Sequence, residues 1–123
     1  LKLLTEEAKV GKIDKNILRQ LFKVVIDDTE YEIAARSDYV DFLHTEIKRL
    51  KNALSYYHKM MACKQGSEKH EYYKAGVQMY LYGHEDPYKV ELMLAEFKET
   101  LKNRQDIVQR LYQEVRAIKK LTI

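Results

Sequence analysis

The stretch VDFLHTEIKRLKNALSYYHKMM, residues 40–61, decides the fold. Its apolar residues recur at alternating steps of three and four, the spacing of one face of an α-helix that packs along another helix. The residues that carry this pattern without a miss are Val40, Leu43, Ile47, Leu50, Leu54, Tyr57 and Met61. The stretch therefore predicts a long helix with a coiled-coil-like seam.

A second long helix is predicted to begin at Asp86-Pro87, because Asp caps free amides and Pro fits the first helical position. Its seam also advances by three and four, with one polar interruption, and consists of Val90, Leu94, Phe97, Leu101, Arg104, Val108, Leu111, Val115 and Ile118. A shorter helix is expected between the two. Ser67 and His70 are spaced to cap its beginning, and Gly83 is expected to close it.

Two long helices joined by a short connection are expected to return antiparallel. If Met61 lies near Val90, Glu46 lies close enough to pair with Arg104, which needs a partner because an unpaired charge in an apolar seam is costly. A parallel dimer through one long helix has the same periodicity, and the pattern does not separate the two topologies. The predicted fold class is all-α: an antiparallel long-helix hairpin with shorter packing helices, forming a helical bundle.

The amino-terminal part is predicted to form a small helical hairpin. A helix over residues 1–10 is expected to stop at Gly11, and Asp14 is expected to cap a helix over 15–25 whose apolar face comprises Ile17, Leu18, Leu21 and Phe22. The run Ile26-Asp27-Asp28-Thr29 interrupts the pattern, and Thr29 is expected to cap a new helix that reaches Ala35 or continues through Ser37 with at most a kink.

We expect one helical domain over residues 1–123, consisting of the short hairpin 1–25 and the long-helix bundle 26–123. The first residue is Leu1 rather than Met, so the chain is expected to be a fragment of a longer protein.

The bulk composition favours a cytoplasmic protein. Lys and Arg number 22 against 19 Asp and Glu, giving a net charge of +3, too small to indicate a nucleic-acid partner. Cys63 is the only cysteine, which excludes an internal disulfide and suits a reducing compartment. The sequence has neither a signal-peptide pattern nor an apolar run of membrane-spanning length, so no membrane association is predicted.

No catalytic residue, metal site or cofactor is predicted. His44 and His58 lie about 21 Å apart along one helix and cannot share an ion. His70 with Glu71, and His84 with Glu85, lack the spacing of helical zinc and di-iron sites. The Cys63 side chain is expected to pack in the core. The glycines are isolated from one another and so do not form a phosphate-binding loop.

Tyrosine is unusually abundant, with ten residues and no tryptophan. The tyrosines concentrate on either side of one turn, where they could line a site for a planar ligand, form a partner-binding patch or simply pack as core. The candidate patch residues are His58, His70, Tyr72, Tyr73 and Tyr80. Core packing is the favoured interpretation, and Gly76 is expected to allow another helix to approach closely.

The opening stretch LLTEEAKVGKIDKNIL, residues 3–18, resembles the closing helices of HD-type phosphohydrolase domains of the HD-GYP kind. In that family a helix, a Gly-Lys-hydrophobic-Asp link and a short apolar helix end the domain. The resemblance implies that residues from about 26 onward form a helical module following such a domain in a bacterial signalling protein. The His-Asp and Gly-Tyr-Pro motifs of the family are absent, so no catalytic residue is carried over.

The function predicted from the sequence is that of a non-enzymatic protein–protein interaction, signal-transmitting or oligomerisation module. Its partner would be another protein or a second copy of the chain, with a homodimer as one option. The first alternative is a small-ligand sensor built on the Tyr, Met and His cluster. A nucleic-acid-binding helical domain is the second alternative, disfavoured because basic and acidic residues share the same helices.

Overall fold

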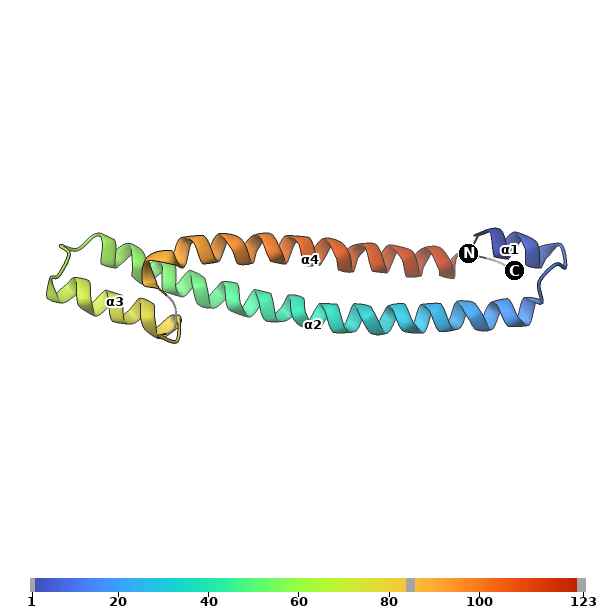
Figure 1. Ribbon diagram of the computed structural model, residues 1–123, viewed down its shortest axis with the longest axis horizontal. Helices are drawn as coiled ribbons and strands as arrows, with labels where there is room; N and C mark the ends of the chain where they lie inside the picture. The colour runs from blue at the N-terminus through green and yellow to red at the C-terminus, as the bar shows by residue number, and fades with distance from the viewer. Residues whose placement is uncertain (1, 84–85, 122–123) are drawn as a thin grey trace. The chain divides into compact units, whose positions relative to one another are not determined.

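The computed structural model describes residues 2–83 and 86–121, and these residues form helices and connecting turns without any strand. The elements are α1 (Lys2–Lys9), α2 (Lys15–Met61), α3 (Glu68–Tyr80), a single 3₁₀ turn η1 (Pro87–Lys89) and α4 (Val90–Lys119), labelled in Figure 1. The predicted all-α bundle with a long helix pair is therefore confirmed.

The chain is organised as two compact units. Leu1–Tyr39 and Arg104–Ile123 make the first unit, and Val40–Asn103 make the second. Each long helix thus contributes one part to each unit. The sequence-based subdivision instead separated residues 1–25 from 26–123.

In the first unit, α2 and α4 run antiparallel. Lys119 Nζ donates to Glu30 Oε1 at 3.0 Å, and the Arg104 guanidinium lies 5.5 Å from the centre of the Tyr39 ring, so residue numbers rise along one helix as they fall along the other. The core of this unit is built by α1 and the first turns of α2. Its buried residues are Ala8, Leu18 and Phe22, with Leu4, Ile13, Ile118 and Leu121 packed against them.

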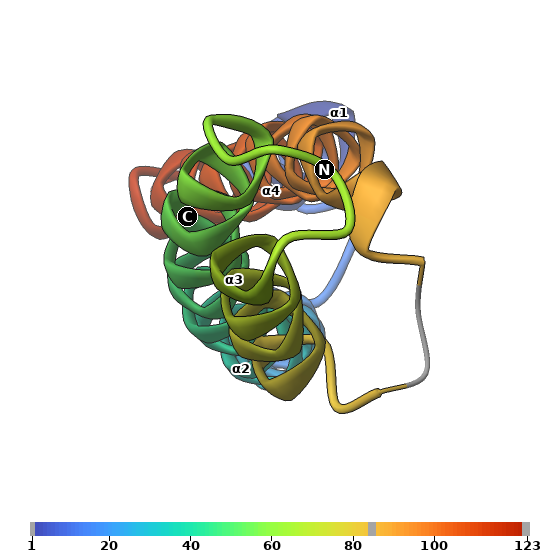
Figure 2. The same ribbon diagram turned by 90° about the vertical axis from the view of Figure 1, so that its left-hand side faces the viewer.

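In the second unit, α3 lies alongside the last part of α2, as Figures 1 and 2 show. One cluster of buried residues joins α2, the α3 segment and α4: Ile47, Leu50, Ala53, Val77, Leu81, Val90 and Leu94. At the rim of this unit, His58 Nε2 lies 3.3 Å from Glu91 Oε1. These contacts hold the second unit together.

Helix α2 is continuous from Lys15 to Met61, so the break predicted at residues 26–29 is wrong. Thr29 does not cap a new helix. Its Oγ1 donates to the Val25 carbonyl at 2.7 Å, the bond that a threonine makes inside a helix to the residue four positions earlier. The helix can therefore run through the polar interruption.

The caps predicted at Asp14, Ser67 and Asp86, and the predicted closure of α3 at Gly83, are confirmed. Asp14 Oδ1 accepts from the Asn16 amide at 2.7 Å, Ser67 Oγ accepts from the His70 amide at 3.2 Å, and Asp86 Oδ1 accepts from the Tyr88 amide at 2.9 Å. Gly83 has a positive φ of 71° and its amide donates to the carbonyl of Gln78, closing the end of α3. The turn after Asp86 is 3₁₀, and the α-helix begins only at Val90.

Most residues of the two predicted seams point inward within one chain. Leu43, Ile47, Leu50, Val90, Leu94 and Val115 are buried, and Val40, Leu54, Tyr57, Phe97, Leu101, Val108, Leu111 and Ile118 are half-buried. Met61 is 56% exposed, whereas its neighbour Met60 is fully buried. On a straight α-helix, the face marked by a strict seven-residue pattern rotates by about 20° with each heptad. At the end of α2 this rotation turns Met60, rather than Met61, toward the core.

The predicted pairing of Glu46 with Arg104 joins residues of the two units and stays a prediction. Glu46 binds Arg49, three residues later on the same helix, with Oε2 accepting from Nε at 3.1 Å. Arg104 is exposed and stacks on Tyr39, so its charge reaches solvent and needs no carboxylate in the seam.

No helix within residues 2–83 and 86–121 has the length and apolar character required to cross a bilayer.

Candidate functional site

The histidines are dispersed, and the part of the chain that the structure describes contains no group of three His, Cys, Asp or Glu side chains placed to hold a metal ion. His58 is exposed beside Glu91, whereas the His70 side chain is buried. Among residues 2–83 and 86–121, His70 Nδ1 has no hydrogen-bond partner; the Glu71 carboxylate lies 3.4 Å away without hydrogen-bond geometry. His84 and Glu85 lie outside the described residues.

The candidate tyrosine patch divides between core and surface. Tyr56 of α2 lies between two rings of α3, with its centre 6.4 Å from that of Tyr73 and 5.7 Å from that of Tyr80. Tyr72 is 69% exposed and touches Tyr73 edge-on, while Tyr57 makes an edge contact with Tyr88. Of the five predicted patch residues, His70 is buried, Tyr73 and Tyr80 are half-buried, and His58 and Tyr72 are exposed.

Gly76 explains how α3 approaches α2 so closely. A Cβ built on Gly76 would lie 2.8 Å from Tyr56 Cδ1 and 3.1 Å from Tyr56 Cγ, shorter than ordinary carbon contacts. The Tyr56 ring thus occupies the space that any other residue would fill. As predicted, this glycine serves close helix packing.

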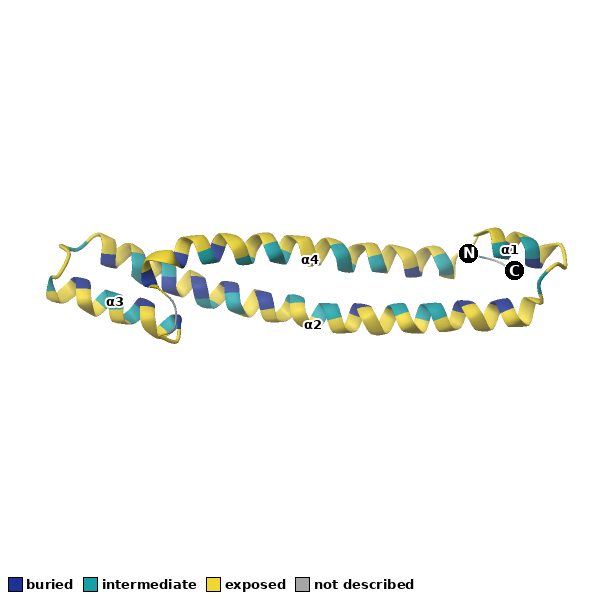
Figure 3. Cartoon of the chain, viewed as in Figure 1, coloured by how far each residue is buried: buried dark blue, intermediate teal, exposed yellow. Residues whose placement is uncertain are grey.

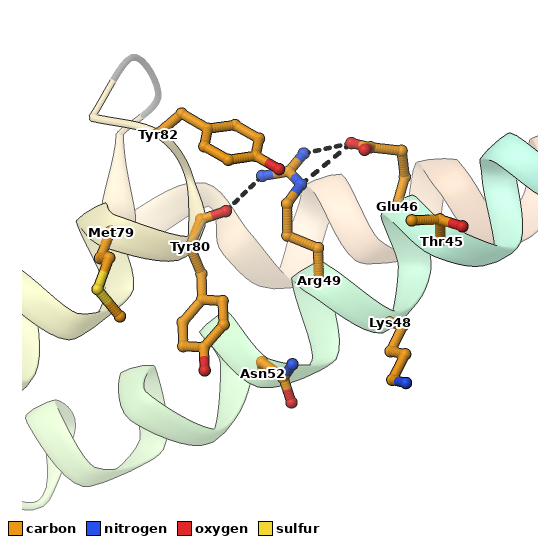
Figure 4. A pocket seen from close by; sticks show the side chains of 8 residues that line it. All are labelled: Thr45, Glu46, Lys48, Arg49, Asn52, Met79, Tyr80 and Tyr82. Atoms are coloured by element: carbon orange, nitrogen blue, oxygen red, sulfur yellow. Dashed lines mark hydrogen bonds and ion pairs between the residues drawn. The ribbon is translucent and has the colours of Figure 1, made fainter.

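Arg49 ties the end of α3 to α2 (Figure 4). Its Nη1 donates to the Tyr80 carbonyl at 2.6 Å, its Nη2 and Nε donate to Glu46 Oε2, and its guanidinium lies 4.7 Å from the centre of the Tyr82 ring. Tyr82 reaches this position through a left-handed backbone conformation with φ of 58°. The side chains of Arg49 and Glu46 are 11% and 15% exposed, so water screens their interaction only weakly.

A shallow groove of about 410 Å³ runs beside this contact. Figure 4 labels the side chains that line it: Thr45, Glu46, Lys48, Arg49, Asn52, Met79, Tyr80 and Tyr82. Three of the five N–H donors of Arg49 are engaged by Glu46 and the Tyr80 carbonyl, and these bonds tie α3 to α2.

Four large apolar side chains of α2 point away from the core of the first unit, and we call them the α2 stripe: Ile17, Leu21, Val24 and Tyr31. Their exposed fractions are 63%, 41%, 56% and 79%, respectively. The residues that follow the first two, Leu18 and Phe22, are buried. Because one residue turns a helix by about 100°, the stripe and the core face are adjacent but distinct faces.

The α2 stripe was not separated from the core by sequence reasoning, which assigned Ile17 and Leu21 to the same apolar face as Leu18 and Phe22. A signal was nevertheless present, because positions 17, 24 and 31 are seven residues apart with position 21 between them. Figure 3 shows exposed residues along this part of α2 with buried positions between them. Exposed apolar surface at heptad spacing is typical of a helix that docks against another helix.

Comparison of the chain with protein families, curated proteins and solved structures finds no match in any of the three.

Proposed function

We propose that the chain is a non-enzymatic helical protein–protein interaction module that receives its partner on the α2 stripe. The observation that carries the proposal is the exposure of Ile17, Leu21, Val24 and Tyr31 at the spacing of a helix-docking face. Scattered exposed apolar residues are common, but a line of large ones along one helix marks a contact surface.

The seams are less suited to this purpose, because most of their residues pack within one chain. Leu43 and Leu50 are 1% and 0% exposed, so a partner that used them would first have to open the second unit. The α2 stripe requires no such opening. Full burial of a large apolar side chain contributes about 1.5–3 kcal/mol of free energy. The side chains of the stripe are already partly covered, so a partner that buries the rest gains roughly half of this amount for each one.

Site-specific photo-crosslinking in the host cell tests the proposal. A photoreactive residue replaces Val24 in one variant and Arg19 in a matched control, since Arg19 is exposed on the same helix about 200° from Ile17. We expect a discrete crosslinked species of defined mass from position 24 and none from position 19. Equal labelling at the two positions, or none at position 24, would contradict the proposed function.

A further inference from the structure

Arg104 is the single charged residue in the apolar seam predicted for α4, and its guanidinium has no acidic neighbour along the helix. Side chains that can pair with it on the same helix lie three or four residues away. These positions hold only uncharged residues: Thr100, Leu101, Ile107 and Val108. Within residues 2–39 and 104–121, the Arg104 guanidinium makes no ion pair with a carboxylate. Its positive charge therefore has no counterion in the first unit.

A second arginine lines the same groove as Arg104. This groove, of about 300 Å³, belongs to the first unit and is lined by Ala35, Arg36 and Tyr39 of α2 and by Arg104 of α4. The Arg104 guanidinium lies 5.5 Å from the centre of the Tyr39 ring, and the Arg36 side chain is 36% exposed. None of the four lining residues is acidic. The two helices thus bring two positive charges to one small groove.

Glu32 binds Arg36 but leaves most of its guanidinium available. Glu32 Oε1 accepts from Arg36 Nε at 2.9 Å, one turn earlier on the same helix. Within the part of the chain that the structure describes, the Nη donors of Arg36 make no hydrogen bond to protein atoms. Two guanidinium groups that line one groove repel each other, and an anion bound to both removes this repulsion. The groove therefore has the charge and the free donors of an anion site.

We infer that this groove binds a phosphate group, held between Arg36 and Arg104 beside the Tyr39 ring. A guanidinium presents planar, paired donors that match two oxygens of one anion. A carboxylate satisfies one such pair of donors, whereas a tetrahedral phosphate has oxygens for both arginines. The volume of the groove admits a phosphate group with a small substituent, so the ligand class is a small phosphorylated molecule.

The inference goes beyond the proposed function. None of the four α2 stripe residues lines the groove, so the phosphate site does not depend on a partner bound to the stripe. Loss of the crosslink from position 24 would remove the proposed partner contact and leave the phosphate site untouched.

Titration of the purified full chain with inorganic phosphate, followed by NMR of ¹⁵N-labelled arginine side chains, tests the site. At constant low ionic strength, the Nε–H signals of Arg36 and Arg104 should move together, with a dissociation constant on the order of 1 mM. The signal of Arg110, which is exposed on α4 and does not line the groove, should stay in place. Arg36 and Arg104 signals that do not move by about 10 mM phosphate would overturn the inference, as would equal movement of the Arg110 signal.

Arg104→Gln and its matched control Arg110→Gln test whether the position of the guanidinium matters. Both changes remove one positive charge from an exposed position of α4. Followed at the Arg36 signal, Arg104→Gln should weaken phosphate binding about tenfold, because one of two pairs of charged donors is lost, while Arg110→Gln should change it by less than about twofold. Equal weakening by the two changes would show a general effect of net charge and overturn the site.

Acetate at the same ionic strength tests the chemical class of the ligand. It should bind at least about fivefold more weakly than phosphate, because a carboxylate satisfies the donors of one arginine only. Acetate that binds as tightly as phosphate would overturn the assignment of a phosphate group.

Discussion

Replacing Gly76 by alanine should destabilise the second unit, although the same change in most helices is stabilising. Gly76 lies inside α3, where alanine ordinarily gains about 0.5–1 kcal/mol over glycine. Here the new methyl group would lie 2.8 Å from Cδ1 and 3.1 Å from Cγ of Tyr56. The short contact reaches the base of the ring, so Tyr56 cannot avoid it by a small movement of its tip.

The size of the effect follows from how firmly the ring is held. Tyr56 packs between Tyr73 and Tyr80, and Lys59 Nζ lies 5.4 Å from the centre of its ring. Forcing one extra methyl group into such a packed contact costs about 1–3 kcal/mol. After the gain in helix propensity is subtracted, we expect Gly76→Ala to lower the free energy of unfolding by about 1 kcal/mol.

Urea unfolding followed by circular dichroism measures this change in a double-mutant cycle. In a Tyr56→Ala background the obstruction is gone, and Gly76→Ala should raise the free energy of unfolding by about 0.5–1 kcal/mol. The sign of the substitution should therefore reverse between the two backgrounds. Stabilisation by Gly76→Ala in the wild-type background, or the same change in both, would refute the close-packing explanation.

Three further substitutions test other contacts by the same unfolding measurement. Arg49→Lys should cost about 1–2 kcal/mol, because an ammonium cannot bind Glu46 and the Tyr80 carbonyl together in the planar geometry of the guanidinium; an unchanged free energy would show that Arg49 is not a tie. Ser67→Ala should cost about 1 kcal/mol through loss of the cap on the His70 amide, and no loss would contradict the capping assignment. Leu43→Asp should cost about 3 kcal/mol or more by burying an unpaired charge, whereas a folded variant of near wild-type stability would mean that Leu43 is not in the core.

The long helices and their caps could be predicted from sequence because they depend on local signals. Apolar spacing of three and four residues predicted the inward-facing side of α2 and α4, and the side chains of Ser67 and Asp86 predicted two helix starts. The continuity of α2 through Thr29 could not be predicted, because a threonine hydroxyl can either cap a helix or bond back to a carbonyl inside it. Only the tertiary setting decides between the two.

Less of the candidate site could be predicted from the sequence. The register between α2 and α4 depends on how whole helices pack, so the stacking of Arg104 on Tyr39 could not be read from spacing along either helix. The seven-residue spacing of positions 17, 24 and 31 marks one face of α2, but whether that face is buried or exposed depends on where α1 packs. Ile17 and Leu18 are adjacent and equally apolar, and only the fold separates them.

Sedimentation equilibrium of the purified chain, from about 10 μM to about 1 mM, tests the central claim most directly. A mass that rises above that of one chain in the wild type, and not in Val24→Glu, would identify the partner of the α2 stripe as a second copy; Asn16→Glu, an exposed position on the same helix but off the stripe, is the control. A wild-type chain that stays monomeric would leave a different protein as the partner, which the crosslink from position 24 then has to reveal. A monomeric chain that also gives no crosslink from position 24 would contradict the claim that the α2 stripe is a contact surface.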